Sequence, residues 1–198
     1  KTKVEGIDNL IEAGKRVVIV ANHTSHIDAV VLLSMINTKI SYPVEANKIR
    51  QWWLTPFRKM IKPLPIDPSN HLAIRTIIKD LKKNKKVLLF PEGRVTTTGT
   101  LMKIYESPGL IAIKSDAVIL PVRIEGTQFS IFSHLKGKVR TKLFPNFKIT
   151  FLKPYKLNPP KQLAGREKRQ YASNKIFEIM SNMYFESNNH NETLFQAL

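Results

Sequence analysis

The segment Val17-Val-Ile-Val-Ala21, followed at once by Asn22-His-Thr-Ser-His-Ile-Asp28, decides the fold. Its first five residues are all apolar and mostly β-branched, which predicts a strand buried on both faces, and the polar residues after it predict a loop. Two further apolar runs, Val87–Phe90 and Val118–Ile124, have the same character. Strands of this kind belong to parallel sheets covered on both sides, so the sequence predicts an α/β fold with a mostly parallel central sheet flanked by helices.

Apolar residues at helical spacing between these runs predict the helices. The expected helices span Asp28–Met35, Lys48–Met60, His71–Leu81, Ser107–Lys114 and Arg166–Met183. In the fourth, Ser107 is the expected N-cap and Pro108 the first helical residue. Pro63, Pro65 and Pro68 predict a rigid extended loop, and Lys148–Phe151 a fourth strand. The whole chain, 1–198, is expected to form one domain.

The composition is strongly basic. Lys and Arg number 32 against 15 acidic residues, giving a formal net charge of +17. Such a surface attracts polyanions, namely nucleic acid, anionic lipid or an acidic carrier protein, unless the charge only keeps the protein in solution. The absence of cysteine excludes disulfides, thiolate zinc sites and a cysteine nucleophile. No apolar run reaches the roughly 20 residues of a membrane span, and the first residues do not resemble a signal peptide, so any membrane contact is expected at the surface.

The loop after the first strand carries the first candidate site, His23 and Asp28. Across a strand-to-helix loop an Asp five residues after a His can accept the Nδ1 proton of the imidazole. This leaves Nε2 free to take a proton from a hydroxyl group. The residues alone leave a second interpretation open, in which the pair only closes the loop and caps a helix. His26, in the same loop, is interpreted as structural.

The second candidate site, Glu92-Gly93-Arg94, follows the strand Val87–Phe90. An Arg beside a Gly can bind a phosphate through paired donors, although a surface turn with an ion pair would have the same sequence. Active sites gather at the carboxyl ends of parallel strands, so both candidate sites are expected on one rim of the sheet. The segment Leu120–Gly126 is interpreted as a buried strand without chemistry of its own.

Together these segments resemble the glycerolipid acyltransferase family. The family's motifs stand here, in order, as Asn22-His23-x4-Asp28, Phe90-Pro-Glu-Gly-Arg94 and Val118-Ile-Leu-Pro-Val122. The longer string Glu92-Gly-Arg-Val-Thr-Thr-Thr-Gly99 is similar to the acyltransferase part of bacterial enzymes that join a 2-acylglycerophosphoethanolamine acyltransferase to an acyl-(acyl carrier protein) synthetase. This resemblance implies that residues from about 160 to 198 form a helical segment leading to an acyl-activating domain.

The resemblance also implies the chemistry. His23 would deprotonate the free hydroxyl of a lysophospholipid, which attacks an acyl thioester directly, and Asp28 would stabilise the imidazolium. Arg94, with Glu92, Gly93 and Asn22, would bind the acceptor. No metal or cofactor is implied, and the co-substrate would be acyl-(acyl carrier protein) or acyl-coenzyme A.

The acceptor is inferred from one departure. Many relatives that use a phosphate monoester carry an Arg after an Ile-Asp pair, whereas Pro68 follows Ile66-Asp67 here. This favours lysophosphatidylethanolamine, in phospholipid repair, over lysophosphatidic acid, the acceptor of 1-acylglycerol-3-phosphate acyltransferases. The alternatives outside the enzyme class are an inactive lipid-binding domain and a basic nucleic-acid-binding module. The ordered motifs argue against nucleic acid as a partner, since it would explain only the charge.

The expected location is the cytoplasmic face of a bacterial inner membrane, held peripherally or monotopically. Trp52, Trp53 and Phe57 lie among cations, as suits a lipid interface, although an ordinary amphipathic helix has the same pattern. The expected partners are the membrane surface with its lysophospholipid, acyl carrier protein, and a fused or associated acyl-activating domain.

Overall fold

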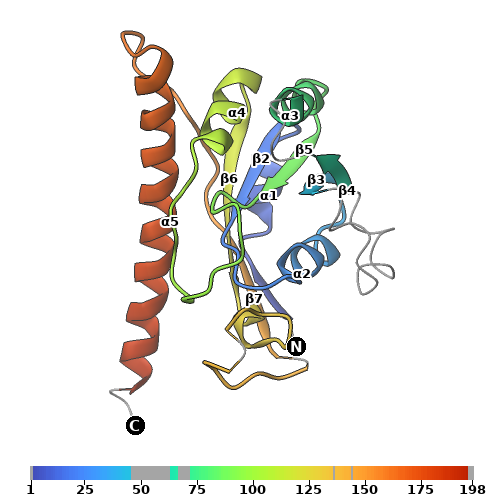
Figure 1. The fold of residues 1–198 in the computed structure, drawn as a ribbon, viewed down its shortest axis with the longest axis vertical. Helices are drawn as coiled ribbons and strands as arrows, with labels where there is room; N and C mark the ends of the chain where they lie inside the picture. The colour runs from blue at the N-terminus through green and yellow to red at the C-terminus, as the bar shows by residue number, and fades with distance from the viewer. Residues whose placement is uncertain (1, 46–62, 67–71, 136, 144, 196–198) are drawn as a thin grey trace.

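The computed structural model describes residues 2–45, 63–66, 72–135, 137–143 and 145–195. Its centre is β2 (Val17–Ala21), all five residues of which are buried. On one side β2 pairs in parallel with β5 (Lys86–Leu89), and on the other with β6 (Val118–Glu125). The three apolar runs that decide the fold are therefore adjacent strands of one sheet (Figure 1).

The full sheet in the described residues has the order β1-β7-β6-β2-β5-β3-β4, with β8 paired to β6. Its pairs are parallel except β6–β7 and β6–β8. The predicted α/β class with a mostly parallel sheet is confirmed. The remaining strands are β1 (Thr2–Glu5), β3 (Ile40–Glu45), β4 (Pro63–Ile66), β7 (Phe147–Phe151) and β8 (Tyr155–Lys156).

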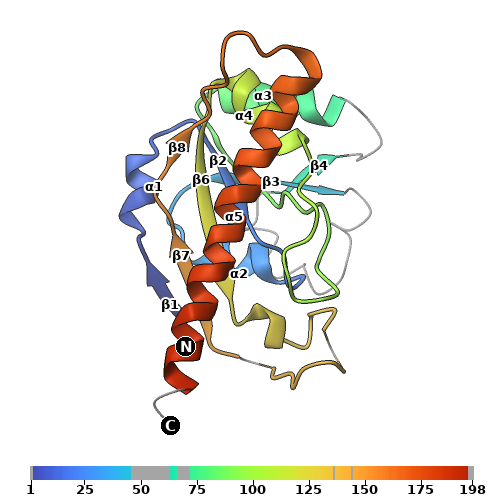
Figure 2. The same cartoon turned by 90° about the vertical axis from the view of Figure 1, so that its left-hand side faces the viewer.

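Helices cover both faces of the sheet (Figures 1 and 2). One apolar cluster joins the sheet to α1 (Asp8–Glu12) and α2 (Asp28–Ser34). A second joins the other face to α3 (Leu72–Lys82), α4 (Ser107–Ser115) and α5 (Gly165–Phe195). Alternate residues of β2 enter the two clusters, as expected for a strand in the middle layer.

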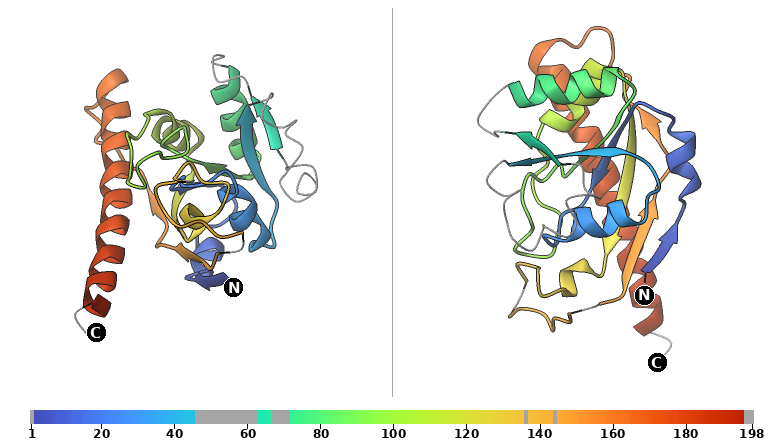
Figure 3. Two further views of the ribbon diagram at one scale, coloured as in Figure 1. Left: turned by 60° about the horizontal axis from the view of Figure 1, so that its bottom comes forward. Right: turned by 90° about the vertical axis from the view of Figure 1, so that its right-hand side faces the viewer.

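Helices α4 and α5 approach each other closely at Gly109. A Cβ added there would lie 2.5 Å from the Cβ of Ala172. Because Gly109 has no side chain, α5 can pack directly against α4. The long α5 then runs along the molecule (Figure 3).

Several local predictions differ from the structure. Helix α4 begins one residue earlier than expected: Glu106 is the N-cap residue, already helical and without a side-chain cap bond, so the prediction that Ser107 caps the helix is wrong. The expected extended loop at Pro63 and Pro65 is instead the strand β4, which lies at the sheet edge, where proline is tolerated because no ladder donor is needed. The predicted helix over Lys48–Met60 lies outside the described residues.

Candidate active site

The structure brings His23 and Asp28 into contact. The Nδ1 atom of His23 lies 2.9 Å from Oδ2 of Asp28, and that oxygen also accepts the backbone N–H groups of Thr24 (2.6 Å) and Ser25 (2.9 Å). Asp28 is completely buried as the first residue of α2, because the loop folds back over its carboxylate. The carboxylate thus closes the loop and orients the imidazole at once.

A second contact holds the imidazole ring. The ring of Phe90, the residue directly after β5, stacks on His23 with centroids 3.9 Å apart and an interplanar angle of 10°. Tyr42 supports Phe90 edge-on at 5.8 Å. The His23 side chain is 12% exposed, and its Nδ1 is engaged by Asp28. The nitrogen left to meet a substrate is therefore Nε2.

Glu92 joins the two sequence motifs from beneath the loop. Its Oε1 accepts the backbone N–H of His23 at 2.9 Å, and its Oε2 accepts that of Met102 at 3.0 Å. Burial raises the pKa of Glu92, and the two backbone donors partly oppose this shift. A carboxylate that is 1% exposed and bonded on both oxygens positions the loop, and the expected contact of Glu92 with the acceptor stays a prediction.

Asn22 is also structural in this arrangement. Its side-chain amide donates to the carbonyl of Ile124 at 2.8 Å and accepts the N–H of Ile124 at 2.7 Å. Asn22 is 2% exposed and extends the pairing of β2 with β6 beyond the end of β2. Both ends of the amide are thus used within the protein, and the expectation that Asn22 binds substrate stays a prediction.

Gly93 and Arg94 lie at the surface. Gly93 has a φ of +68°, and an added Cβ would lie 3.0 Å from the ring of Tyr105, so this tight turn favours glycine. Arg94 is exposed and has no hydrogen-bond or ion-pair partner among the described residues. Its guanidinium is therefore available to an anionic ligand on the rim that holds His23.

The loop containing His23 is also held by a segment that the sequence did not suggest. The hydroxyl of Thr24 bonds Thr127 at 2.8 Å, and that of Ser25 bonds Ser130 at 2.8 Å. Ser133 donates its hydroxyl to the carbonyl of Thr24 at 3.0 Å. The only sequence signal is three small hydroxyl residues at three-residue intervals after β6.

His26, which is interpreted as structural from the sequence, also contacts the segment after β6. Its backbone N–H donates to the carbonyl of Phe132 at 3.3 Å, and its Nε2 lies 2.9 Å from Nε2 of His134. Its exposed ring thus pairs with the neighbouring segment, away from the contact between His23 and Asp28.

The helix α5 reaches the same region from the other face of the sheet. The ring of Tyr184 lies 4.3 Å from the guanidinium of Arg123 on β6. Burial raises the pKa of Tyr184, and the charge of Glu92 adds to this shift. Although β6 was expected to carry no chemistry, it provides the partner of Asn22 and a cation beside α5.

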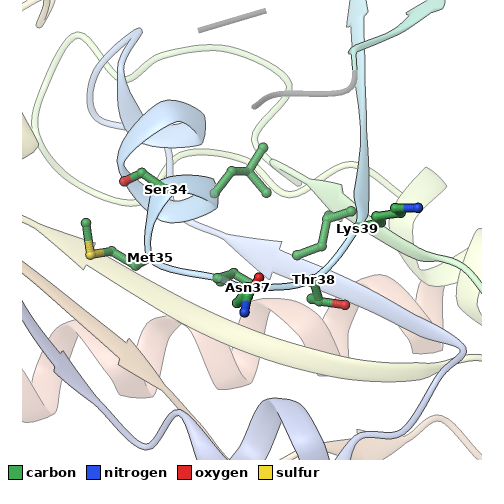
Figure 4. Close-up of a pocket in the computed structure, with 8 residues that line it drawn as sticks. Ser34, Met35, Asn37, Thr38 and Lys39 are labelled. Carbon is green, nitrogen blue, oxygen red and sulfur yellow. The ribbon is translucent and has the colours of Figure 1, made fainter. Parts of the chain in front are cut away.

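The described residues contain no group of three or more His, Asp or Glu side chains able to hold a metal, and no helix that is both long and apolar enough to cross a bilayer. A hollow of about 410 Å³ lies along the turn between α2 and β3, lined by residues 33–40 (Figure 4). It adjoins the end of α2 opposite Asp28, so it is separate from the site.

Comparisons with known proteins give the chemistry a context. The family model described as Acyltransferase matches residues 1–125. Two chloroplast 1-acyl-sn-glycerol-3-phosphate acyltransferases, LPAT1 of Arabidopsis thaliana and BAT2 of Brassica napus, are each 26% identical over 136 residues, or 64% of this chain. The chain spans only 36% and 38% of the length of these relatives.

A solved structure has the same fold. The crystal structure of the 1-acyl-sn-glycerophosphate (LPA) acyltransferase PlsC from Thermotoga maritima aligns with a TM-score of 0.62 and 22% identity, covering 92% of this chain and 72% of that one. The family match includes the His23–Asp28 loop and the Glu92–Arg94 turn, and it extends over more than half of the sequence. This chain belongs to the Acyltransferase family.

Proposed function

We propose that the protein transfers an acyl group from a thioester to the free hydroxyl of a lysophospholipid, with lysophosphatidic acid as the acceptor. The observation that carries this proposal is an imidazole oriented by a buried carboxylate on the rim that also presents an exposed arginine without an internal partner. A base that activates a hydroxyl and a cation that binds a phosphate are what this reaction requires.

The proposed step uses residues of the described site. His23 Nε2 takes the proton of the acceptor hydroxyl while the hydroxyl oxygen attacks the thioester carbonyl. Asp28 stabilises the imidazolium that forms. The C–S bond then breaks, an ester forms, and the imidazolium returns the proton to the departing thiolate. The thiol released belongs to acyl carrier protein or coenzyme A. Arg94 would hold the acceptor phosphate with paired hydrogen bonds.

The names of the relatives support lysophosphatidic acid, since both curated relatives and the structural neighbour are described as acting on 1-acylglycerol-3-phosphate. This choice corrects the preference drawn from the sequence. Lysophosphatidylethanolamine remains the second candidate because Pro68 stands where many monoester-specific relatives have an arginine, and because the string Glu92–Gly99 resembles the bifunctional bacterial enzymes. A phosphodiester carries less charge and would need fewer cations.

The wider setting is part of the proposal. The acceptor is a lipid and the protein carries a net charge of +17, so the enzyme would act at an anionic membrane surface, on the cytoplasmic side of a bacterial inner membrane. Acyl carrier protein or an acyl-activating domain, fused or associated, would supply the thioester.

The test is acyl transfer by the purified protein with acyl carrier protein and coenzyme A thioesters as donors. Lysophosphatidic acid and lysophosphatidylethanolamine compete as acceptors. We expect preference for lysophosphatidic acid and a loss of about 1,000-fold or more in the rate for His23→Ala. His134→Ala, which removes an exposed imidazole beside the same loop, is the matched control and should retain most of the activity. Preference for the ethanolamine lipid would select the second candidate, whereas transfer that survives His23→Ala would exclude the mechanism.

A further inference from the structure

The segment after β6 that bonds the His23 loop buries small polar side chains and exposes large apolar ones. Its small polar residues Thr127, Ser130 and Ser133 are buried against the loop, at 0%, 0% and 5% exposure. Its large apolar residues Phe129 and Ile131 point outward and are 42% and 39% exposed. A segment folded only for water would place these two kinds of residue the other way round.

A third exposed apolar residue belongs to the same surface. Leu143 is 58% exposed, and the neighbouring Lys142 donates its backbone N–H to the carbonyl of Phe129 at 2.7 Å. A β-bridge between Ser130 and Lys142 joins the two stretches. Residues 127–135 and 137–143 therefore form one surface unit, which we call the outer segment; in Figures 1 and 3 it lies at the end of the molecule opposite α3 and α4.

Cations lie between the apolar residues of the outer segment. Lys138, Arg140 and Lys142 are all exposed. Lys138 also donates from Nζ to the carbonyl of Thr97 at 2.9 Å, which fixes the outer segment to the loop after Arg94. The sequence from residue 126 to residue 166 has nine Lys and Arg and no acidic residue. No acidic residue nearby in the sequence therefore neutralises the positive charge of this surface.

From these observations we infer that the outer segment is the part of the protein that docks on an anionic phospholipid bilayer. Phe129, Ile131 and Leu143 enter the interface between headgroups and acyl chains, while Lys138, Arg140 and Lys142 contact lipid phosphates. Apolar side chains interspersed with cations suit this interface. An acidic protein partner would be met by charge alone, leaving the outward apolar residues unexplained. The inference deepens the proposed function by naming the membrane-facing surface of the same site.

The contacts of the outer segment give the docking a consequence for catalysis. It bonds Thr24 and Ser25, whose backbone N–H groups donate to the carboxylate that orients His23. A bilayer that binds the outer segment is therefore two hydrogen bonds away from the catalytic carboxylate. Docking would place the reactive nitrogen beside the surface from which the acceptor comes.

The first measurement is binding to vesicles made of equal parts phosphatidylglycerol and phosphatidylcholine, by co-sedimentation. A cation near such a surface contributes about fivefold to partitioning, so replacing Lys138, Arg140 and Lys142 by Gln should weaken binding about 100-fold. The matched control replaces three exposed lysines at the end of α3 and in the turn after it, Lys79, Lys82 and Lys83, at the opposite end of the molecule, and should weaken binding only a few-fold. Equal weakening by both triple variants would overturn the inference, because net charge alone would then explain binding.

A second variant replaces Phe129, Ile131 and Leu143 by Ser. These side chains together expose little more than the surface of one full side chain, so binding should weaken roughly 50-fold. Ile11, Met35 and Phe177, which are also exposed, provide the control set. Unchanged vesicle binding by this variant, with an intact circular dichroism spectrum, would refute the inference. So would a variant that binds vesicles normally but no longer binds acyl carrier protein.

Activity assays separate this inference from the proposed function. On a short-chain lysolipid dispersed as monomers, both outer-segment variants should transfer acyl groups at the wild-type rate, while their transfer to vesicle-borne acceptor falls with binding. If wild type transfers to neither form, the proposed function fails while vesicle binding still tests the outer segment. Wild-type activity on vesicles in both variants would overturn the docking role.

Discussion

Replacing Asp28 with Asn tests the orientation of His23 most directly. The change conserves shape, and an amide oxygen can still accept the backbone N–H groups of Thr24 and Ser25, so the loop should remain closed. It removes the negative charge beside the imidazole, 2.9 Å from Nδ1. An imidazolium and a carboxylate with charge centres about 4 Å apart attract by about 4 kcal/mol at an effective dielectric constant of 20. Loss of this attraction in the transition state corresponds to a decrease of about 1,000-fold in kcat.

The assay is steady-state release of thiol from an acyl thioester at saturating acceptor, with the thermal unfolding midpoint measured in parallel. Asp80→Asn is the matched control, since Asp80 also faces a cation, Lys85, at 2.9 Å, but lies on α3. It should leave kcat unchanged. A decrease of less than about tenfold for the folded Asp28→Asn protein would refute the electrostatic reasoning.

Three further outcomes follow from the site. Arg94→Ala should lower kcat/KM for a phosphate-bearing acceptor about 10- to 100-fold without changing stability. Arg75→Ala, which removes an exposed arginine of α3, should leave kcat/KM unchanged. Acyl-transfer rates with the two acceptors in competition will measure both effects. Burial raises the pKa of Glu92 above its ordinary value of 4.5. Its contribution to the unfolding free energy is therefore greatest below pH 4.5 and is lost as the pH rises through the pKa of the folded state. Urea unfolding measured at several pH values should show this decrease in wild type and not in Glu92→Gln. Tyr184→Leu should lower the unfolding free energy by about 1 kcal/mol more than Tyr155→Leu, since the ring of Tyr184 lies 4.3 Å from the guanidinium of Arg123. Equal losses in the two variants, measured by urea unfolding, would contradict this contribution of the ring–cation contact.

The sequence predicted the central layer well. The runs in β2, β5 and β6 are continuous and apolar because these strands are covered on both faces, and such runs have few other interpretations. It did not predict β1 or β3. In β1 charged residues alternate with others, and Lys3 and Glu5 pair with each other at the sheet edge. In β3 the proline at position 43 interrupts the pattern. Only β1 lies at the edge, where a strand buries less, while β3 is an inner strand whose apolar signal is broken by its proline.

The candidate site was predicted in part for a similar reason. The spacing of His23 and Asp28 is a local property of one loop, and the structure brings them together. The roles of Asn22 and Glu92 depend on partners far along the chain, Ile124 and Met102, which no local pattern reveals. Polar residues in a motif can bind a substrate or brace a loop, and only burial distinguishes the two.

The bonds between the catalytic loop and the outer segment have a consequence for biosynthesis. The partners of Thr24 and Ser25 lie 103 and 105 residues later in the chain. A ribosome takes roughly 5 to 20 seconds to add that many residues. During this interval the nascent chain exposes the apolar strand β2 before β6 is available to pair with it. The same long separation in sequence therefore leaves an interval in which the nascent chain is prone to aggregation.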